Sequence, residues 1–188
     1  MAQAKTFTQG ELDQVLRYLA KTRYSARNRA LVLMSFWSGM RVGEIARLTI
    51  AHVRSEDGSI KQEVRLAPDE TKGRHARTVF LNAKLRGEIA AYLRSRPIRN
   101  LTDPLFFTDR RAGFTANTLT QWYFWTYRHA GIAGASSHSG RRTFITNLAN
   151  QGVGVRVLAS LAGHRSIAVT QCYIDVNDDM KRRAVELV

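Results

Sequence analysis

The sequence has few of the residues that would place it among disulfide-linked, metal-ligating or membrane proteins. Its 188 residues include one cysteine, Cys172, which excludes an internal disulfide and any metal site built from several cysteines. The longest apolar run, Ala30 to Trp37, is far shorter than the roughly 20 residues that a membrane span needs. The first residues carry no apolar core typical of a signal peptide. These absences favour a cytoplasmic protein without a membrane span.

Acidic residues are also scarce. The chain has 15 Asp and Glu against 29 Lys and Arg, so its net charge is +14 and its pI is about 10.8. Of the 29 basic residues, 23 are arginines, which hold phosphate in a planar, two-pronged manner. This balance indicates a polyanionic partner, either nucleic acid or an anionic membrane surface, although a merely basic surface is the alternative. No acidic cluster suits a magnesium ion, so we expect no metal and no cofactor.

The spacing of apolar residues predicts one domain, over residues 1–188, in which helices surround a small sheet. The length is sufficient for one complete core. We expect three short antiparallel strands, at 49–53, 60–66 and 77–81. Two helices have a predicted boundary residue: one runs from residue 25 and stops at Gly39, and another begins at Asn82. The other helices are predicted at about 8–21, 42–48, 116–130, 139–151, 155–162, 166–174 and 178–187. Because strands and helices are segregated rather than alternating, the fold class is α+β.

Six side chains are of the kinds that phosphodiester cleavage by a tyrosine requires. Taken singly, each has an ordinary structural explanation, such as a helix cap, a solvated loop charge or a core residue. A tyrosine hydroxyl has a pKa near ~10, so at neutral pH it needs a base and a strong positive field. Arginines supply that field without losing their protons, and lysine and histidine can exchange protons. The six candidates, judged as an ordered set, are Arg41, Lys72, His138, Arg141, His164 and Tyr173.

The motifs around these residues resemble those of the tyrosine recombinases, the phage integrase family. Ser38–Leu48 resembles the family's first arginine motif, and Thr71-Lys72-Gly73 resembles its lysine before a strand. His138-Ser139-Gly140-Arg141 is similar to the His-x-x-Arg motif. Leu161-Ala162-Gly163-His164, followed nine residues later by Tyr173, resembles the Leu-Gly-His…Tyr ending. The resemblance runs from about residue 8 to 175, nearly the whole chain.

The resemblance implies a mostly helical catalytic domain that cuts and rejoins DNA through a 3′-phosphotyrosyl intermediate, without metal or ATP. Tyr173 would be the nucleophile, and Arg41, Arg141 and His164 would hold the scissile phosphate. Lys72 would protonate the departing 5′ oxygen.

Two further roles follow from the same resemblance. His138 would help to accept the proton of the tyrosine. Glu44, three residues after Arg41, is expected to orient a catalytic cation. Four other arginines, Arg74, Arg110, Arg111 and Arg142, are candidates for contact with the DNA backbone.

The sequence departs from the family pattern in three places. Arg142 stands where a histidine is common, and Gly140 where a larger apolar residue is usual. The first predicted helix begins at about residue 8, which leaves no room for a separate N-terminal DNA-binding domain. We therefore expect either a single-domain form, similar to the fimbrial-switch recombinases, or a piece of a longer protein.

The expected partners are double-stranded DNA and further copies of the chain, which would form a dimer or tetramer on DNA. Accessory DNA-bending proteins are an open alternative, and no membrane partner is expected. The segment 176–188 would pack on a neighbouring copy or on its own domain. The resemblance implies a role in DNA integration, in a mobile element of bacterial, phage or plasmid origin. Two alternatives to a recombinase are a type IB topoisomerase-like enzyme, which relaxes DNA without exchanging strands, and a DNA-binding relative without catalytic activity.

Overall fold

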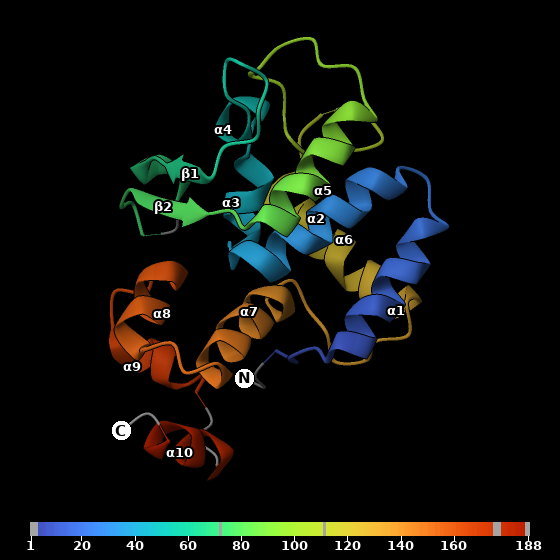
Figure 1. Cartoon of the computed structure of the whole chain (residues 1–188). Coiled ribbons are helices and arrows are strands. Elements are labelled where there is room, and N and C mark those ends of the chain that lie inside the picture. Colours follow the sequence, from blue (N-terminus) through green and yellow to red (C-terminus); the bar gives the residue numbers. More distant parts are fainter. Residues whose placement is uncertain (1–3, 72, 111, 175–177, 187–188) are drawn as a thin grey trace.

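The computed structural model describes residues 4–71, 73–110, 112–174 and 178–186, and it forms a helical body with a small hairpin on one side (Figure 1). Lys72, Arg111 and the residues 175–177 and 187–188 of the expected C-terminal segment lie outside the described residues. In chain order the elements are α1 (Gln9–Ala20), α2 (Ser25–Ser38), α3 (Val42–Arg47), α4 (Ile50–Val53), β1 (Glu63–Leu66), η1 (Pro68–Glu70), β2 (Arg77–Phe80), α5 (Ala83–Arg94), α6 (Ala116–His129), α7 (Ser139–Asn150), α8 (Val155–Ala162), α9 (Ile167–Gln171) and α10 (Asp178–Val185).

Several helix boundaries follow from local sequence signals. Thr8 and Glu11 form a reciprocal capping box at the start of α1. Asn82 accepts a hydrogen bond from the backbone N–H of Leu85 at the start of α5. Gly39 ends α2 with φ +63°, a left-handed conformation that favours glycine. The predicted helices at these positions are therefore confirmed.

Helix α2 is the centre of the hydrophobic core. Ten of its 14 residues are buried, and it packs against α1, α5 and α7. The run that sequence inspection marked as the longest apolar stretch supplies most of this burial, since Ala30 to Met34 are fully inaccessible. A helix buried on almost every side is expected to be apolar all round rather than amphipathic.

The sheet has two strands among the described residues, not the three that the sequence predicted. β1 and β2 pair antiparallel, with Val64 opposite Val79. The predicted strand at 49–53 is instead the single-turn helix α4. His52 Nδ1 accepts the backbone N–H of Thr49 at 3.0 Å, and the Ile50 N–H donates to the Asp103 carbonyl at 3.0 Å. This cap and this long-range bond overrode the preference of branched residues for extended structure.

The close approach of α7 to α2 explains the glycine that departs from the family pattern. A Cβ atom at Gly140 would lie 2.3 Å from Ser35 Oγ and 2.9 Å from Phe36 Cδ2, both on α2. The missing side chain therefore lets the helix that carries Arg141 lie directly against the core helix. Gly140 therefore permits close packing of α7 on α2.

Helices α8 and α9 form a smaller layer below the hairpin (Figure 1). α8 buries Leu158, Ala159 and Ala162, whereas α9 buries only Thr170. Gly163 ends α8 with φ +63° and turns the chain toward α9. None of the described helices is long and apolar enough to cross a bilayer.

Candidate active site

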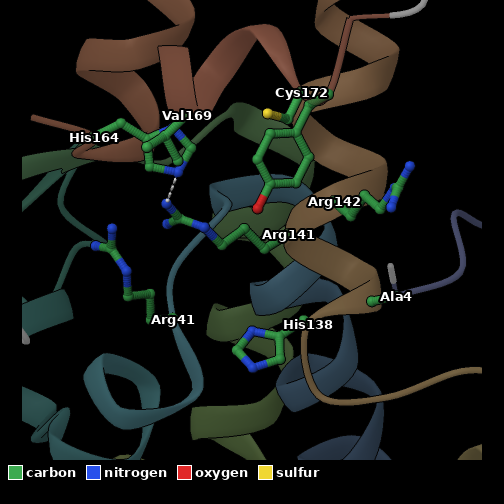
Figure 2. A pocket seen from close by; sticks show the side chains of 9 residues that line it. Ala4, Arg41, His138, Arg141, Arg142, His164, Val169 and Cys172 are labelled. Carbon is green, nitrogen blue, oxygen red and sulfur yellow. Dashed lines mark hydrogen bonds between the residues drawn. The ribbon is translucent and has the colours of Figure 1, made fainter. Parts of the chain in front are cut away.

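A pocket of about 580 Å³ brings together most of the residues that the sequence singled out (Figure 2). Arg41 enters it from the residue before α3, and His138 from the residue before α7. His164 and Tyr173 come from the turns that follow α8 and α9. The lining residues are Ala4, Arg41, His138, Arg141, Arg142, His164, Val169, Cys172 and Tyr173. Five of the six predicted residues thus converge, and the sixth, Lys72, lies outside the described residues.

Arg141 is buried at the base of the pocket. Its Nη1 donates to the carbonyl of Gly39 at 2.8 Å, and its Nη2 donates to that of Ala162 at 2.6 Å. These carbonyls stand at the C-terminal ends of α2 and α8, where helix dipoles concentrate partial negative charge. Two helix ends therefore orient the guanidinium and compensate part of its cost of burial.

Burial and neighbouring cations disfavour the protonated form of Arg141. Burial, and then the charges of Arg41 and Arg77, lower the pKa of Arg141 to about 9, while Glu44 acts in the opposite direction. The side chain therefore stays protonated at neutral pH. Several guanidinium groups held close together in this way create a strong field for an anion, because a bound phosphate relieves their mutual repulsion.

Arg41 is held by Glu44 and by the turn after α8. Its Nη1 donates to Glu44 Oε1 at 3.1 Å, and its Nη2 donates to the Gly163 carbonyl at 3.1 Å. Glu44 is almost fully buried, with 1% of its side chain exposed, whereas Arg41 keeps 25% exposed. This geometry is what the orienting role expected for Glu44 requires.

His164 is held in a single tautomer. A guanidinium can only donate, so the 2.8 Å contact from Arg141 Nη2 makes His164 Nε2 the acceptor (Figure 2). The proton then lies on Nδ1, which donates to the hydroxyl of buried Thr170 at 2.9 Å. Burial, followed by the charges of Arg141, Arg41 and Arg77, lowers the pKa of His164 to about 4. The imidazole is therefore neutral at pH 7.

Tyr173 lies beside this group within the same chain. Its ring stacks on that of His164, with centroids 5.7 Å apart and planes 23° apart. Arg142 places its guanidinium carbon 5.9 Å from the centroid of the Tyr173 ring. The arginine that replaces the usual histidine is thus a neighbour of the tyrosine, rather than only a candidate for contact with the DNA backbone.

The other predicted residues are placed differently. His138 is exposed and lies on the side of Arg141 away from His164 (Figure 2). Arg74 and Arg110 are exposed and do not line the pocket, and Arg111 lies outside the described residues. In the part of the chain that is described, no cluster of three or more histidine, cysteine or acidic side chains is arranged to hold a metal ion.

Sequence reasoning missed two residues of this region, Thr170 and Arg77. Arg77 Nη2 donates to Glu44 Oε2 at 3.1 Å, and its Nη1 donates to the Leu161 carbonyl at 3.1 Å. A signal for it existed. Arg77 and buried Val79 are two residues apart on one strand and so share a face, which places a charged side chain toward the interior.

The fold and the pocket together define a class of protein in which a tyrosine stands beside a buried arginine and histidine group. The chain belongs to the phage integrase family, whose profile matches residues 5–180. It is 32% identical over 185 residues to the tyrosine recombinase XerA of Thermococcus kodakarensis, a match that covers 97% of this chain and 62% of the relative. The chain therefore spans about three-fifths of the length of that curated relative.

Solved structures share the fold. A crystal structure of XerA recombinase superposes with a TM-score of 0.77 at 23% identity, covering 100% of this chain and 64% of the other. The integrase of the Tn1549 transposon, solved with a circular intermediate DNA, gives a TM-score of 0.79 at 17% identity, with coverage of 100% and 67%. The predicted family and the predicted mostly helical class with a small antiparallel sheet are confirmed.

Proposed function

We propose that this protein is a site-specific DNA recombinase that cuts and rejoins strands through a covalent bond to Tyr173. The observation that carries the proposal is the convergence of Arg41, Arg141, His164 and Tyr173 in one pocket of one chain. Pure DNA binding has no use for a tyrosine that shares a pocket with a buried arginine and stacks on a histidine. Relatives named tyrosine recombinases, and a structural neighbour solved with DNA, support double-stranded DNA as the substrate.

The reaction that we propose balances without a cofactor. The hydroxyl oxygen of Tyr173 attacks the scissile phosphorus, and the bond from phosphorus to the 5′ oxygen breaks. Lys72 gives the departing 5′ oxygen its proton, and His138 helps to accept the proton of the tyrosine. A 5′ hydroxyl of another strand then reverses these steps. Because the phosphotyrosyl bond conserves the energy of the phosphodiester, rejoining needs no ATP.

The cations act on the charge that develops at the phosphate. Arg41 and Arg141 bind the non-bridging oxygens, where fixed donors in a water-poor site stabilise the transition state strongly. In the structure His164 accepts a hydrogen bond from Arg141. A bound phosphate would accept the hydrogen bonds of the Arg141 guanidinium in place of His164. Its negative charge would also favour the protonated imidazole, which can then donate to the same phosphate oxygens.

We also propose that copies of the chain assemble as a dimer or tetramer on DNA, inside the cytoplasm where that DNA lies. The described chain would serve as one catalytic unit, and neighbouring copies would complete its hold on the duplex. Helix α10 is a candidate for contact between copies, since Val185 exposes 67% of its surface. Packing of α10 on its own domain is the alternative, and the stoichiometry of protein on a two-site DNA, with and without residues 178–188, distinguishes them.

A nicked suicide substrate tests the proposed chemistry. Cleavage releases the short piece of strand that carries the 5′ hydroxyl, so the strand cannot be rejoined and the protein stays covalently bound to DNA. This covalent complex is seen as a band that survives denaturing electrophoresis. Tyr173→Phe should abolish this band, whereas Tyr18→Phe, on α1 outside the pocket, should keep it. A wild-type protein that binds DNA but never forms the band would be a non-catalytic relative. If the band forms, joining of two paired sites supports a recombinase, and relaxation of supercoils alone a topoisomerase-like enzyme.

A further inference from the structure

Arg77 is a largely buried cation outside the set of six. It is the first residue of β2, its side chain is 10% exposed, and it does not line the pocket. Its guanidinium instead lies behind the pocket, where it donates to Glu44 Oε2 at 3.1 Å and to the Leu161 carbonyl at 3.1 Å. A buried arginine is costly unless its hydrogen bonds are specific, so these contacts need an explanation.

The carboxylate of Glu44 is shared between two arginines. Oε1 accepts from Arg41 Nη1 at 3.1 Å, whereas Oε2 accepts from Arg77 Nη2 at 3.1 Å and from the backbone N–H of Arg41 at 2.8 Å. With both oxygens engaged and 1% of its side chain exposed, Glu44 has little freedom to rotate. Arg77 therefore fixes the orientation of the carboxylate that holds Arg41.

The second contact ties the hairpin to the end of α8. Arg77 packs so closely under Gly163 that a Cβ atom there would lie 2.6 Å from Arg77 Nη1. The Gly163 carbonyl in turn accepts from Arg41 Nη2 at 3.1 Å, and His164 follows directly. Arg165, the residue after His164, makes a contact in the opposite direction along the chain: its Nη2 donates to the carbonyl of Gly73, in the turn before β2, at 3.1 Å. Arg77 of β2 thus contacts the end of α8, and the turn before β2 contacts the residue that follows His164.

We propose that Arg77 is a positioning residue which, through Glu44 and the end of α8, holds Arg41 and His164 in the geometry that binds the scissile phosphate. This inference rests on the proposed function. Arg77 does not touch the phosphate itself. Its loss would leave Arg41 paired to a carboxylate that can rotate, and would free the turn at Gly163.

Cleavage measured in a single turnover at saturating DNA tests this role. Arg77→Gln should slow formation of the covalent band by about a hundredfold, the cost of a small misplacement of reacting groups. DNA affinity should change by less than about threefold, because Arg77 makes no contact in the pocket. Arg65→Gln is the matched control, since it removes the same charge from the neighbouring strand, where Arg65 is 85% exposed. This control should cleave at the wild-type rate.

A double-variant cycle separates positioning from a general effect on the fold. If Arg77 acts through Glu44, the Arg77→Gln, Glu44→Gln pair should be about as slow as the slower single variant. Defects that multiply would overturn the inference, as would an Arg77→Gln protein that cleaves within about threefold of wild type. Should Arg77→Gln fail to fold, Arg77→Lys keeps the charge and loses the two-pronged hold. Wild-type cleavage by folded Arg77→Lys would overturn the inference equally.

The protonation of His164 gives a readout that does not depend on cleavage. Besides burial, Arg141 and Arg41, Arg77 is among the causes that lower the pKa of His164. Arg77→Gln should therefore raise the midpoint of the His164 NMR titration, and Arg65→Gln should leave it in place. If the wild type forms no covalent band, the proposed function fails, while this titration still tests the link between Arg77 and the pocket.

Discussion

The two walls of the pocket are built differently. Arg141 belongs to α7, which packs against α2. Ten of the 14 residues of α2 are buried, so α7 lies on the centre of the core. Tyr173 follows α9, a helix of five residues that buries only Thr170. The buried arginine that would bind phosphate thus stands on the best-packed part of the molecule, and the nucleophile on one of the least buried. Fixed charges favour electrostatic stabilisation, whereas a nucleophile must approach and withdraw.

Hydrogen exchange gives the largest expected contrast between these walls. Amides of α2 between Leu31 and Met34 should exchange only through global unfolding, because their surroundings are fully buried. Amides of α9 should open locally and exchange several orders of magnitude faster. Mass spectrometry of exchanged peptides measures both at once. Equal protection of the two helices would refute the contrast.

Replacing Gly140 with alanine should damage the well-packed wall. The new methyl group would meet Ser35 and Phe36 of α2, and overpacking of this kind typically costs about 1–3 kcal/mol. Gly87→Ala on α5 is the matched control. A Cβ there meets nothing within 4 Å, so that variant should gain roughly 0.5–1 kcal/mol from helix propensity. Urea unfolding of both variants measures the difference, and equal effects would show that α7 can shift freely.

Acidification should destabilise the protein through His164. Its folded pKa of about 4 lies below the ordinary value of 6.5, so the unfolded chain binds the proton more readily in that window. The contribution of His164 to the free energy of unfolding is therefore retained above pH 6.5 and falls as the pH drops toward 4. Urea titrations from pH 7 to 4 should show a shallower loss in His164→Gln than in wild type. Parallel profiles would mean that burial and the neighbouring cations do not lower the pKa of this imidazole.

The smallest expected effect concerns a buried hydroxyl in the core. Tyr127 is buried, and no described residue hydrogen-bonds its hydroxyl, whereas the Tyr123 hydroxyl donates to the Leu31 carbonyl at 2.8 Å. Tyr127→Phe should thus be neutral or slightly stabilising, while Tyr123→Phe should cost about 1 kcal/mol. Thermal melts of the pair measure this. A clear loss in Tyr127→Phe would point to a buried water or another partner for that hydroxyl.

Local signals in the sequence predicted most of the helices correctly. Caps at Thr8 and Asn82 and the break at Gly39 act over a few residues, so they can be identified without the rest of the chain. The segment 49–53 was predicted wrongly as a strand. Three of the five residues in this segment are β-branched, a composition that is compatible with either state, and backbone bonds to residues 101 and 103 decided in favour of a helix.

The sequence by itself determined the family, the basic character and the residue types of the pocket, because motifs and composition are properties of the chain order. Only the tertiary structure decided how those residues are held. Arg141 finds the Gly39 carbonyl 102 positions away, and Arg77 meets Glu44 across 33 positions. Contacts of this range depend on how helices pack, and no local pattern encodes them. The tautomer of His164 is likewise set by whichever donors and acceptors the fold brings beside it.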